Sequence, residues 1–229
     1  MKEVKTHAGC IRLVPIFNHL DEESMMKIAT KVRHKNFKRG EYLYQAADED
    51  DTVYIVHQGQ VRIFHLSESG KEQLIRVLNP GDFTGEWTIF SPNAYHEHYA
   101  EATRNSAICV INQNDLLDLL NEYPEISIKI LSSMSERLQE SERQTASVAT
   151  ESVVNRIIYY LEGLANTEME DEVTVELPMT RKDLSSYLGT TPETLSRRFK
   201  ELEKKGVIKP LTKNKIYIPS IEELLFSIE

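Results

Sequence analysis

The chain has 229 residues, 40% of them hydrophobic and 28% charged, with a formal net charge of −9. These proportions are typical of a globular protein large enough for two domains, and they argue against a disordered chain. No apolar run is long enough to span a bilayer, and the N-terminus lacks the features of a cleaved signal peptide, so we expect a cytoplasmic protein. Two cysteines are too few for a disulfide framework.

The segment from about Arg33 to Ile111 is predicted to be all-β. Runs of aromatic and β-branched residues alternate there with turn signals such as Gln58-Gly59 and Pro80-Gly81-Asp82. Alternation within residues 53–57 and 61–65 predicts one buried face for each of these strands. This density of short strands favours a β-roll or jelly-roll barrel.

A short helical segment over residues 114–121 is predicted to precede an uninterrupted helix over about 126–149. In the longer helix, apolar and small residues recur with the 3-4 spacing of a coiled-coil seam. The helix either packs only on its own barrel or pairs with a second copy across a two-fold axis. We favour the second interpretation, in which the dimer helix uses Leu131, Met134, Leu138, Thr145 and Val148.

Residues 180–206 have the pattern of a helix-turn-helix. Thr180 is a suitable N-cap for a first helix, and Gly189 can end it in the left-handed conformation. Thr191 can cap a second helix that has Pro192 at its first position. Apolar residues at spacings of four and three predict one buried face on the second helix, at Leu195, Phe199 and Leu202.

The other face of the second helix carries Glu193, Ser196, Arg197 and Lys200, which can hydrogen-bond base edges and phosphates. A solvated amphipathic helix pair would show a similar pattern. Charge favours nucleic acid, because residues 180–215 hold ten basic and four acidic side chains, a balance of +6, and the rest of the chain carries −15. A basic island on an acidic protein is typical of a phosphate-binding surface.

The flanking segments predict a winged form of this motif. We expect an amphipathic helix over 153–165, a strand over 173–177, two wing strands in 207–219 and a short packing helix over 221–228. Lysines in the wing would meet the DNA backbone. The candidate phosphate contacts are Thr180, Arg181, Lys182, Arg198, Lys200, Lys213 and Lys215.

Barrel, long helix and winged helix-turn-helix, in that order, resemble the CRP/FNR family of bacterial transcription regulators. The most specific matches are NPGDFTGEWTIF over residues 79–90 and the segment 180–206. The resemblance implies an α+β fold with a cyclic-nucleotide-binding-like barrel and N-terminal arm (1–112), a connecting and dimerisation helix (113–149) and a winged helix-turn-helix (150–229). It also implies a homodimer that binds double-stranded DNA and RNA polymerase.

In this family a Gly-Glu pair, here Gly85-Glu86, closes on the ribose of a cyclic nucleotide. The Arg-Ser pair that would grip the cyclic phosphate aligns with His96 and Glu97. A carboxylate repels a buried phosphate, and no arginine replaces the lost charge, which argues against cyclic AMP. Gly85, Glu86 and His96 remain a candidate effector pocket. Alternatively, Gly85 only allows a turn, and Glu86 is a polar group with its hydrogen bonds satisfied within the protein.

The FNR branch holds an iron–sulfur cluster on four cysteines, and two cysteines cannot supply that ligand set. Cys10 and Cys109 nevertheless align with two of its ligands, so the resemblance implies that they approach each other and could form a reversible disulfide. Alternatively, Cys109 is a small core residue and Cys10 an incidental thiol. A bound metal is a further alternative, with His7, Cys10, His96 and His98 as candidate ligands.

The motif Glu193-x-x-Ser196-Arg197 resembles the recognition helix of the FNR branch, whose equivalents read TTGAT-type half-sites in an inverted repeat. Arg197 can pair with guanine, Glu193 can accept from the cytosine amino group, and Ser196 can meet thymine. Pro192 stands where the cyclic AMP branch has a base-reading arginine, which argues against a TGTGA half-site.

Two other classes of function fit the sequence less well. A cyclic-nucleotide-type regulatory module that acts on a protein partner would leave the basic C-terminal helix without a purpose. An enzyme would need a nucleophile elbow, a phosphate-cradling glycine loop or a paired metal motif, and the sequence has none of these. We therefore expect a regulator and not an enzyme, switched either through Cys10 and Cys109 or by a small ligand or metal.

Overall fold

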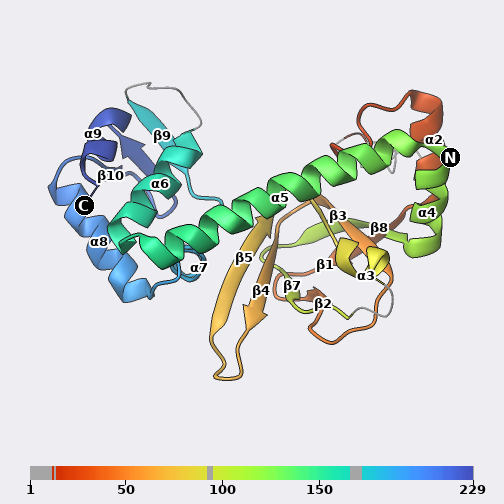
Figure 1. The fold of residues 1–229 in the computed structure, drawn as a ribbon, viewed down its shortest axis with the longest axis horizontal. Helices are drawn as coiled ribbons and strands as arrows, with labels where there is room; N and C mark the ends of the chain where they lie inside the picture. Colours follow the sequence, from red (N-terminus) through yellow and green to blue (C-terminus); the bar gives the residue numbers. More distant parts are fainter. Residues whose placement is uncertain (1–11, 13, 92–94, 166–171, 229) are drawn as a thin grey trace. The chain divides into compact units, whose positions relative to one another are not determined.

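The computed structural model describes residues 12, 14–91, 95–165 and 172–228. The chain divides into two compact units, Met1–Arg137 and Leu138–Glu229, so the longest helix contributes to both (Figure 1). The finer division at residues 112 and 149 stays a prediction.

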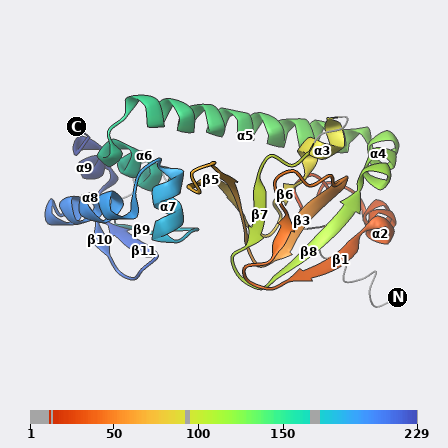
Figure 2. The same ribbon diagram turned by 90° about the horizontal axis from the view of Figure 1, so that it is seen from below.

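Among the described residues, eight short strands form the body of the first unit. They are β1 (Arg33–Phe37), β2 (Tyr42–Tyr44), β3 (Thr52–Gln58), β4 (Val61–Leu66), β5 (Glu72–Leu78), β6 (Phe83–Thr84), β7 (Tyr99–Ala102) and β8 (Ser106–Asn112). Antiparallel pairing arranges them as one sheet in the order β1-β8-β3-β6 and another in the order β2-β7-β4-β5. Figure 2 shows β1, β8 and β3 side by side. The predicted all-β barrel is confirmed.

Two hydrophobic clusters fill the first unit. The inter-sheet cluster takes side chains from both sheets, among them Tyr54 and Val56 of β3. The helix-side cluster packs the other face of β3, with Val53 and Ile55, against the neighbouring helices. The prediction of one buried face for β3 was therefore wrong, because this strand lies between two cores and is buried on both faces.

The alternation predicted for β4 also fails, for a different reason. Val61 and Ile63 are buried as expected, but the pairing register with β5 shifts between Ile63 and Phe64. The extra residue of this bulge is Ile75 on β5, so the alternation of side-chain directions along β4 itself continues. Phe64 lies on the face opposite Ile63 and is buried there, because the Arg62 guanidinium lies over its ring and Tyr99 stacks on it. His65, which was expected to share the inner face, is exposed.

Helices cover one side of the barrel and lead out of it. These helices include α2 (Glu22–Lys31), α3 (Glu86–Phe90), α4 (Gln113–Glu122) and the start of α5 (Pro124–Thr150). Asn112 caps α4 by accepting from the Asp115 N–H at 2.9 Å. Pro124 begins α5 because a proline at the first helical position forfeits no intrahelical hydrogen bond.

The second unit contains the rest of α5 and a small three-stranded sheet with helices. Its elements are α6 (Val153–Ala165), β9 (Val173–Glu176), α7 (Arg181–Tyr187), α8 (Pro192–Lys204), β10 (Lys209–Pro210), β11 (Lys215–Ile218) and α9 (Ile221–Phe226). The sheet order is β10-β11-β9. Every predicted element of this region is present, within a few residues of its expected bounds. No helix in the described part of the chain could cross a membrane.

Candidate nucleic-acid interface and effector cavity

The two helices of the predicted helix-turn-helix begin at the caps expected from the sequence. At α7, the Asp183 N–H donates to Thr180 Oγ1 at 3.1 Å, and the Thr180 hydroxyl donates to Asp183 Oδ2 at 2.6 Å. At α8, the Thr194 N–H donates to Thr191 Oγ1 at 3.2 Å. Between them Gly189 has φ of +63°, the left-handed geometry that a glycine allows.

Helix α8 has one buried and one open face. Leu195, Phe199 and Leu202 are buried against the rest of the second unit. The side that carries the predicted readout residues Glu193, Ser196 and Arg197, with Lys200, is exposed. The geometry that DNA reading requires is therefore present, and the base contacts themselves stay a prediction.

The wing is the β10–β11 hairpin, which pairs with β9 through β11. Lys213 and Lys215 are exposed at its tip, as phosphate contacts require. Lys215 Nζ also lies 3.7 Å from Glu176 Oε2, in an exposed pair that contributes little stability. Thr180 and Lys182, at the start of α7, are likewise exposed.

Two arginines among the predicted phosphate contacts have structural partners that were not predicted from the sequence. The Arg181 guanidinium lies 3.8 Å from the ring centre of Phe199 and donates to the Lys213 carbonyl at 3.4 Å. Burial lowers the pKa of Arg181. Arg198 forms an ion pair with Glu201 at 2.7 Å, one turn along α8. Arg181 thus joins α7 to α8 and to the wing, whereas the Arg198 pair lies within α8 and contributes little stability.

The first unit contains a cavity of about 270 Å³, and the three candidate effector residues, Gly85, Glu86 and His96, all line it. Glu86 is nearly buried, and its Oε1 accepts from Arg76 at 3.0 Å and from Arg137 at 2.7 Å. Burial by itself would raise the pKa of Glu86, but the two guanidinium charges outweigh it and hold the pKa below its usual value. Glu86 is therefore ionised and paired.

These arginines correct the sequence-based view that no arginine supplies charge near this pocket. Arg76 lies on β5 and lines the cavity, and Arg137 reaches Glu86 from α5, 51 residues further along the chain. Neither arginine is close to residue 96 in the sequence, so matching residues 96 and 97 to the family's Arg-Ser pair could not indicate them. Within the described part of the chain, Glu86 Oε2, Arg76 Nε and His96 Nε2 are buried without a hydrogen-bond partner.

The other cavity residues have clear structural roles. Gly85 has φ of +94°, and a Cβ at this position would lie 2.2 Å from the Thr52 carbonyl oxygen, so close backbone packing requires the glycine. His96 is buried and stacks on the Tyr44 ring, with 3.6 Å between ring centres. Burial lowers the pKa of His96 and keeps the ring neutral.

Two family models match the chain. A cyclic nucleotide-binding domain matches residues 34–123, and a Crp-like helix-turn-helix domain matches residues 155–225. The probable transcriptional regulator flp of Lacticaseibacillus casei is 34% identical over 203 residues, which make up 87% of this chain and 90% of that protein. The chain belongs to the CRP/FNR family of transcription regulators.

Solved structures agree with this assignment. A mutant of CooA from Carboxydothermus hydrogenoformans superposes with a TM-score of 0.77 at 18% identity and covers 86% of this chain and 88% of that one. A CRP/FNR-family transcriptional regulator from Thermus thermophilus has a TM-score of 0.61 at 25% identity, covering 85% and 97%. The chain is accordingly a DNA-binding regulator and not an enzyme.

In this regulator the surface of α5 fits the predicted dimer helix in part. The side chains of Leu131 and Leu138 are 62% and 61% exposed, and Thr145 and Val148 are also exposed. Met134 differs, because it is partly buried against the helix-side cluster. The stripe available to a second copy therefore omits Met134 and extends to Ile128, which is 64% exposed.

Of the two candidate redox residues, only Cys109 is in the described part of the chain. It lies on β8 within the helix-side cluster, and its Sγ is 3.9 Å from both ring nitrogens of His34 on β1. Cys10 lies outside the described residues, so its pairing with Cys109 stays a prediction.

Only two of the four candidate metal ligands are in the described part of the chain. His7 and Cys10 lie outside the described residues. His96 and His98 lie just before β7, which begins at Tyr99. Both histidines line the cavity. No cluster of three or more metal-binding side chains occurs among the residues that the structure describes.

Proposed function

We propose that the chain acts as a homodimeric, sequence-specific transcription regulator that reads an inverted repeat with TTGAT-like half-sites. The observation that carries this proposal is the joint exposure of Glu193, Ser196 and Arg197 on one side of α8. Arg197 supplies the paired donors that match guanine O6 and N7. Glu193, one turn earlier, is an acceptor for a cytosine amino group.

The apolar stripe of α5 supports the dimer. Large aliphatic side chains on a helix are normally buried, yet Ile128, Leu131 and Leu138 are each more than half exposed. Pairing of two such stripes would bury them and relate the two copies of α8 by a two-fold axis. A regulator of this kind acts at promoters in the cytoplasm, with RNA polymerase as its expected partner.

For the signal, we propose reversible oxidation that joins Cys10 and Cys109. Such a bond would close a loop of about a hundred residues and fix the N-terminal arm to β8. The competing proposal is a small ligand or metal in the cavity of the first unit, and the three buried polar atoms without partners in the described structure favour a ligand there. The two signals are separable, because only the first requires a sulfur at position 109.

A gel-shift titration with a TTGAT inverted repeat tests the function directly. We expect a dimer-sized complex, lost when both half-sites are scrambled at constant length and salt. Oxidised and reduced protein should differ in affinity, and Cys109→Ser should remove that difference. Equal affinity for the specific and scrambled duplexes would overturn sequence-specific binding. A redox response that persists in Cys109→Ser would overturn the disulfide switch alone.

A further inference from the structure

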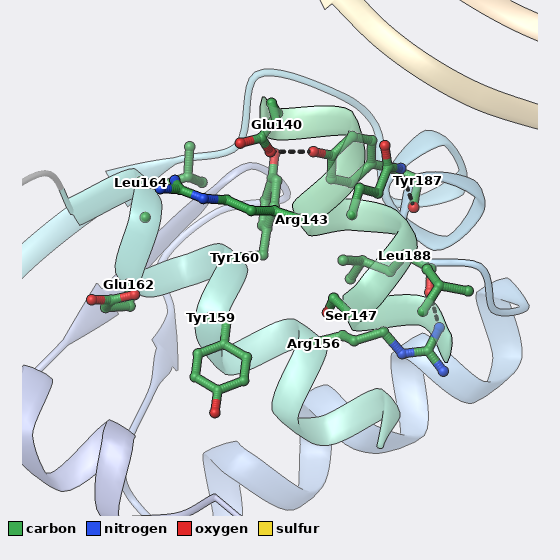
Figure 3. Close-up of a pocket in the computed structure, with 13 residues that line it drawn as sticks. Glu140, Arg143, Ser147, Arg156, Tyr159, Tyr160, Glu162, Leu164, Tyr187 and Leu188 are labelled. Carbon is green, nitrogen blue, oxygen red and sulfur yellow. Dashed lines mark hydrogen bonds between the residues drawn. The ribbon is translucent and has the colours of Figure 1, made fainter. Parts of the chain in front are cut away.

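Three helices of the second unit converge at the end of α7. Figure 3 shows the C-terminal half of α5, together with α6 and α7, around a cavity of about 440 Å³. The residues that surround it include Glu140 and Gln144 of α5, Arg156 and Tyr160 of α6, and Tyr187 of α7. All of them belong to one compact unit.

The main-chain carbonyls that end α7 are held by side chains from the other two helices. Gln144 Nε2 donates to the Tyr187 carbonyl at 2.9 Å. The Arg156 guanidinium donates to the Leu188 carbonyl. The last carbonyls of a helix have no partner within the helix, so these two donors act as an external C-cap.

A side-chain hydrogen bond and close packing reinforce the same junction. The Tyr187 hydroxyl donates to Glu140 Oε1 at 2.9 Å (Figure 3). Burial, and then the bond to Glu140, raise the pKa of Tyr187, so the phenol keeps the proton that it donates. A Cβ added at Gly189 would lie 3.2 Å from both Val148 Cγ1 and Arg156 Nη1, which shows how closely this turn approaches α5 and α6.

We propose that Glu140, Gln144 and Arg156 are positioning residues for DNA binding, which clamp α7 to α5 and α6 and thereby set the direction of α8. The proposal rests on the proposed function. Helix α8 packs directly on α7, where Arg181 lies over Phe199. The clamped part of α5 carries Val148 of the apolar stripe.

The consequence for recognition is geometric. In a dimer that pairs along α5, the clamp fixes the distance and angle between the two copies of α8. Two recognition helices must enter major grooves about one helical turn apart, so a rigid clamp restricts binding to one spacing of the half-sites. A looser clamp would accept other spacings and would bind the best spacing less tightly, because it loses pre-organisation.

The test measures affinity as a function of spacer length. Two full-length proteins are compared: wild type and the double variant Gln144→Ala/Tyr187→Phe. Each is titrated with TTGAT inverted repeats whose spacer has the optimal length, or is one or two base pairs longer or shorter. A duplex with a single half-site is titrated as well. We expect wild type to prefer one spacer sharply. The double variant removes two hydrogen bonds and should reduce that preference about five-fold, the low end of their combined effect, with unchanged affinity for the single half-site.

Two variants of the same junction serve as controls. Tyr160→Phe removes a buried hydroxyl that has no partner in the described structure, and Glu140→Gln keeps an acceptor for Tyr187. Both should retain the wild-type spacer preference. An unchanged preference in the double variant, or an equal loss on the single half-site, would overturn the clamp. Absence of any specific binding by wild type would overturn the proposed function and this inference with it.

Discussion

Arg137 of α5 donates to the buried carboxylate of Glu86 at 2.7 Å, and so joins this long helix to the wall of the cavity within the first unit. The same guanidinium donates to the Phe83 carbonyl at 2.9 Å and lies 4.2 Å from the Phe83 ring centre. The Arg137 side chain therefore connects α5 to β6 through Phe83 and to the start of α3 through Glu86.

Arg137→Met should destabilise the first unit, because it removes one of the two guanidinium groups that pair with the Glu86 carboxylate and leaves the pair with Arg76. We expect a loss of about 1.5–3 kcal/mol in the free energy of unfolding, the range for a hydrogen bond to a charged group. Urea denaturation followed by fluorescence measures this loss, since Trp87 is the single tryptophan of the chain and adjoins Glu86.

Arg137→Met combined with Glu86→Gln should lose less unfolding free energy than the sum of the losses in the two single variants. Strict additivity would show that the pair is not coupled.

Arg197→Ala should relax sequence discrimination rather than weaken binding uniformly. Loss of the paired donors to guanine should cost about 1–3 kcal/mol at the G·C pair of the half-site. Competition titrations against a duplex changed at that base pair give the value. Lys200→Ala is the matched comparison one turn away on α8, and it should weaken binding to both duplexes alike and reduce the salt dependence. A uniform loss in Arg197→Ala would assign that arginine to phosphate.

Leu131→Glu should prevent dimerisation, because it places a carboxylate within the apolar stripe of α5. Lys129→Glu introduces the same side chain on the opposite side of the helix by spacing, and it should leave the dimer intact. Sedimentation equilibrium at several concentrations distinguishes the two. Equal behaviour of the variants would mean that α5 pairs through another surface or not at all.

The first unit should lose stability as the pH falls below about 6.5. Burial lowers the pKa of His96 in the folded chain, so unfolding takes up a proton once the pH is below the ordinary histidine value. This contribution to stability is complete at neutral pH and declines toward the folded pKa. His96→Phe, which can still stack on Tyr44, should flatten the pH profile of the unfolding free energy between pH 7 and 5. Parallel profiles for variant and wild type would assign the acid sensitivity to other groups.

Local patterns in the sequence predicted the second unit well. Thr180, Thr191 and Gly189 mark helix ends by mechanisms that involve only neighbouring residues, and the structure places each one as expected. The buried and exposed faces of α8 likewise follow from its own periodicity. The resemblance to the CRP/FNR family, carried by the same segment, is confirmed by the family models.

What the sequence did not predict depends on contacts between distant residues. The pairing of Arg137 with Glu86 joins residues 51 positions apart, and the bond between Tyr187 and Glu140 spans 47. Burial of β3 on both faces depends on which elements cover it, so alternation within the strand could not show it. The short-range pair of Arg198 and Glu201 is an exception, because its i, i+3 spacing was available from the sequence alone.

The position of β3 has a consequence for how the barrel opens. Its alternate side chains, Val53 and Ile55 on one side and Tyr54 and Val56 on the other, belong to separate hydrophobic clusters. Neither cluster can be solvated without exposing the common backbone between them, so the two should melt as one cooperative unit. Amide hydrogens along this strand should accordingly exchange together, at the slowest rate in the domain.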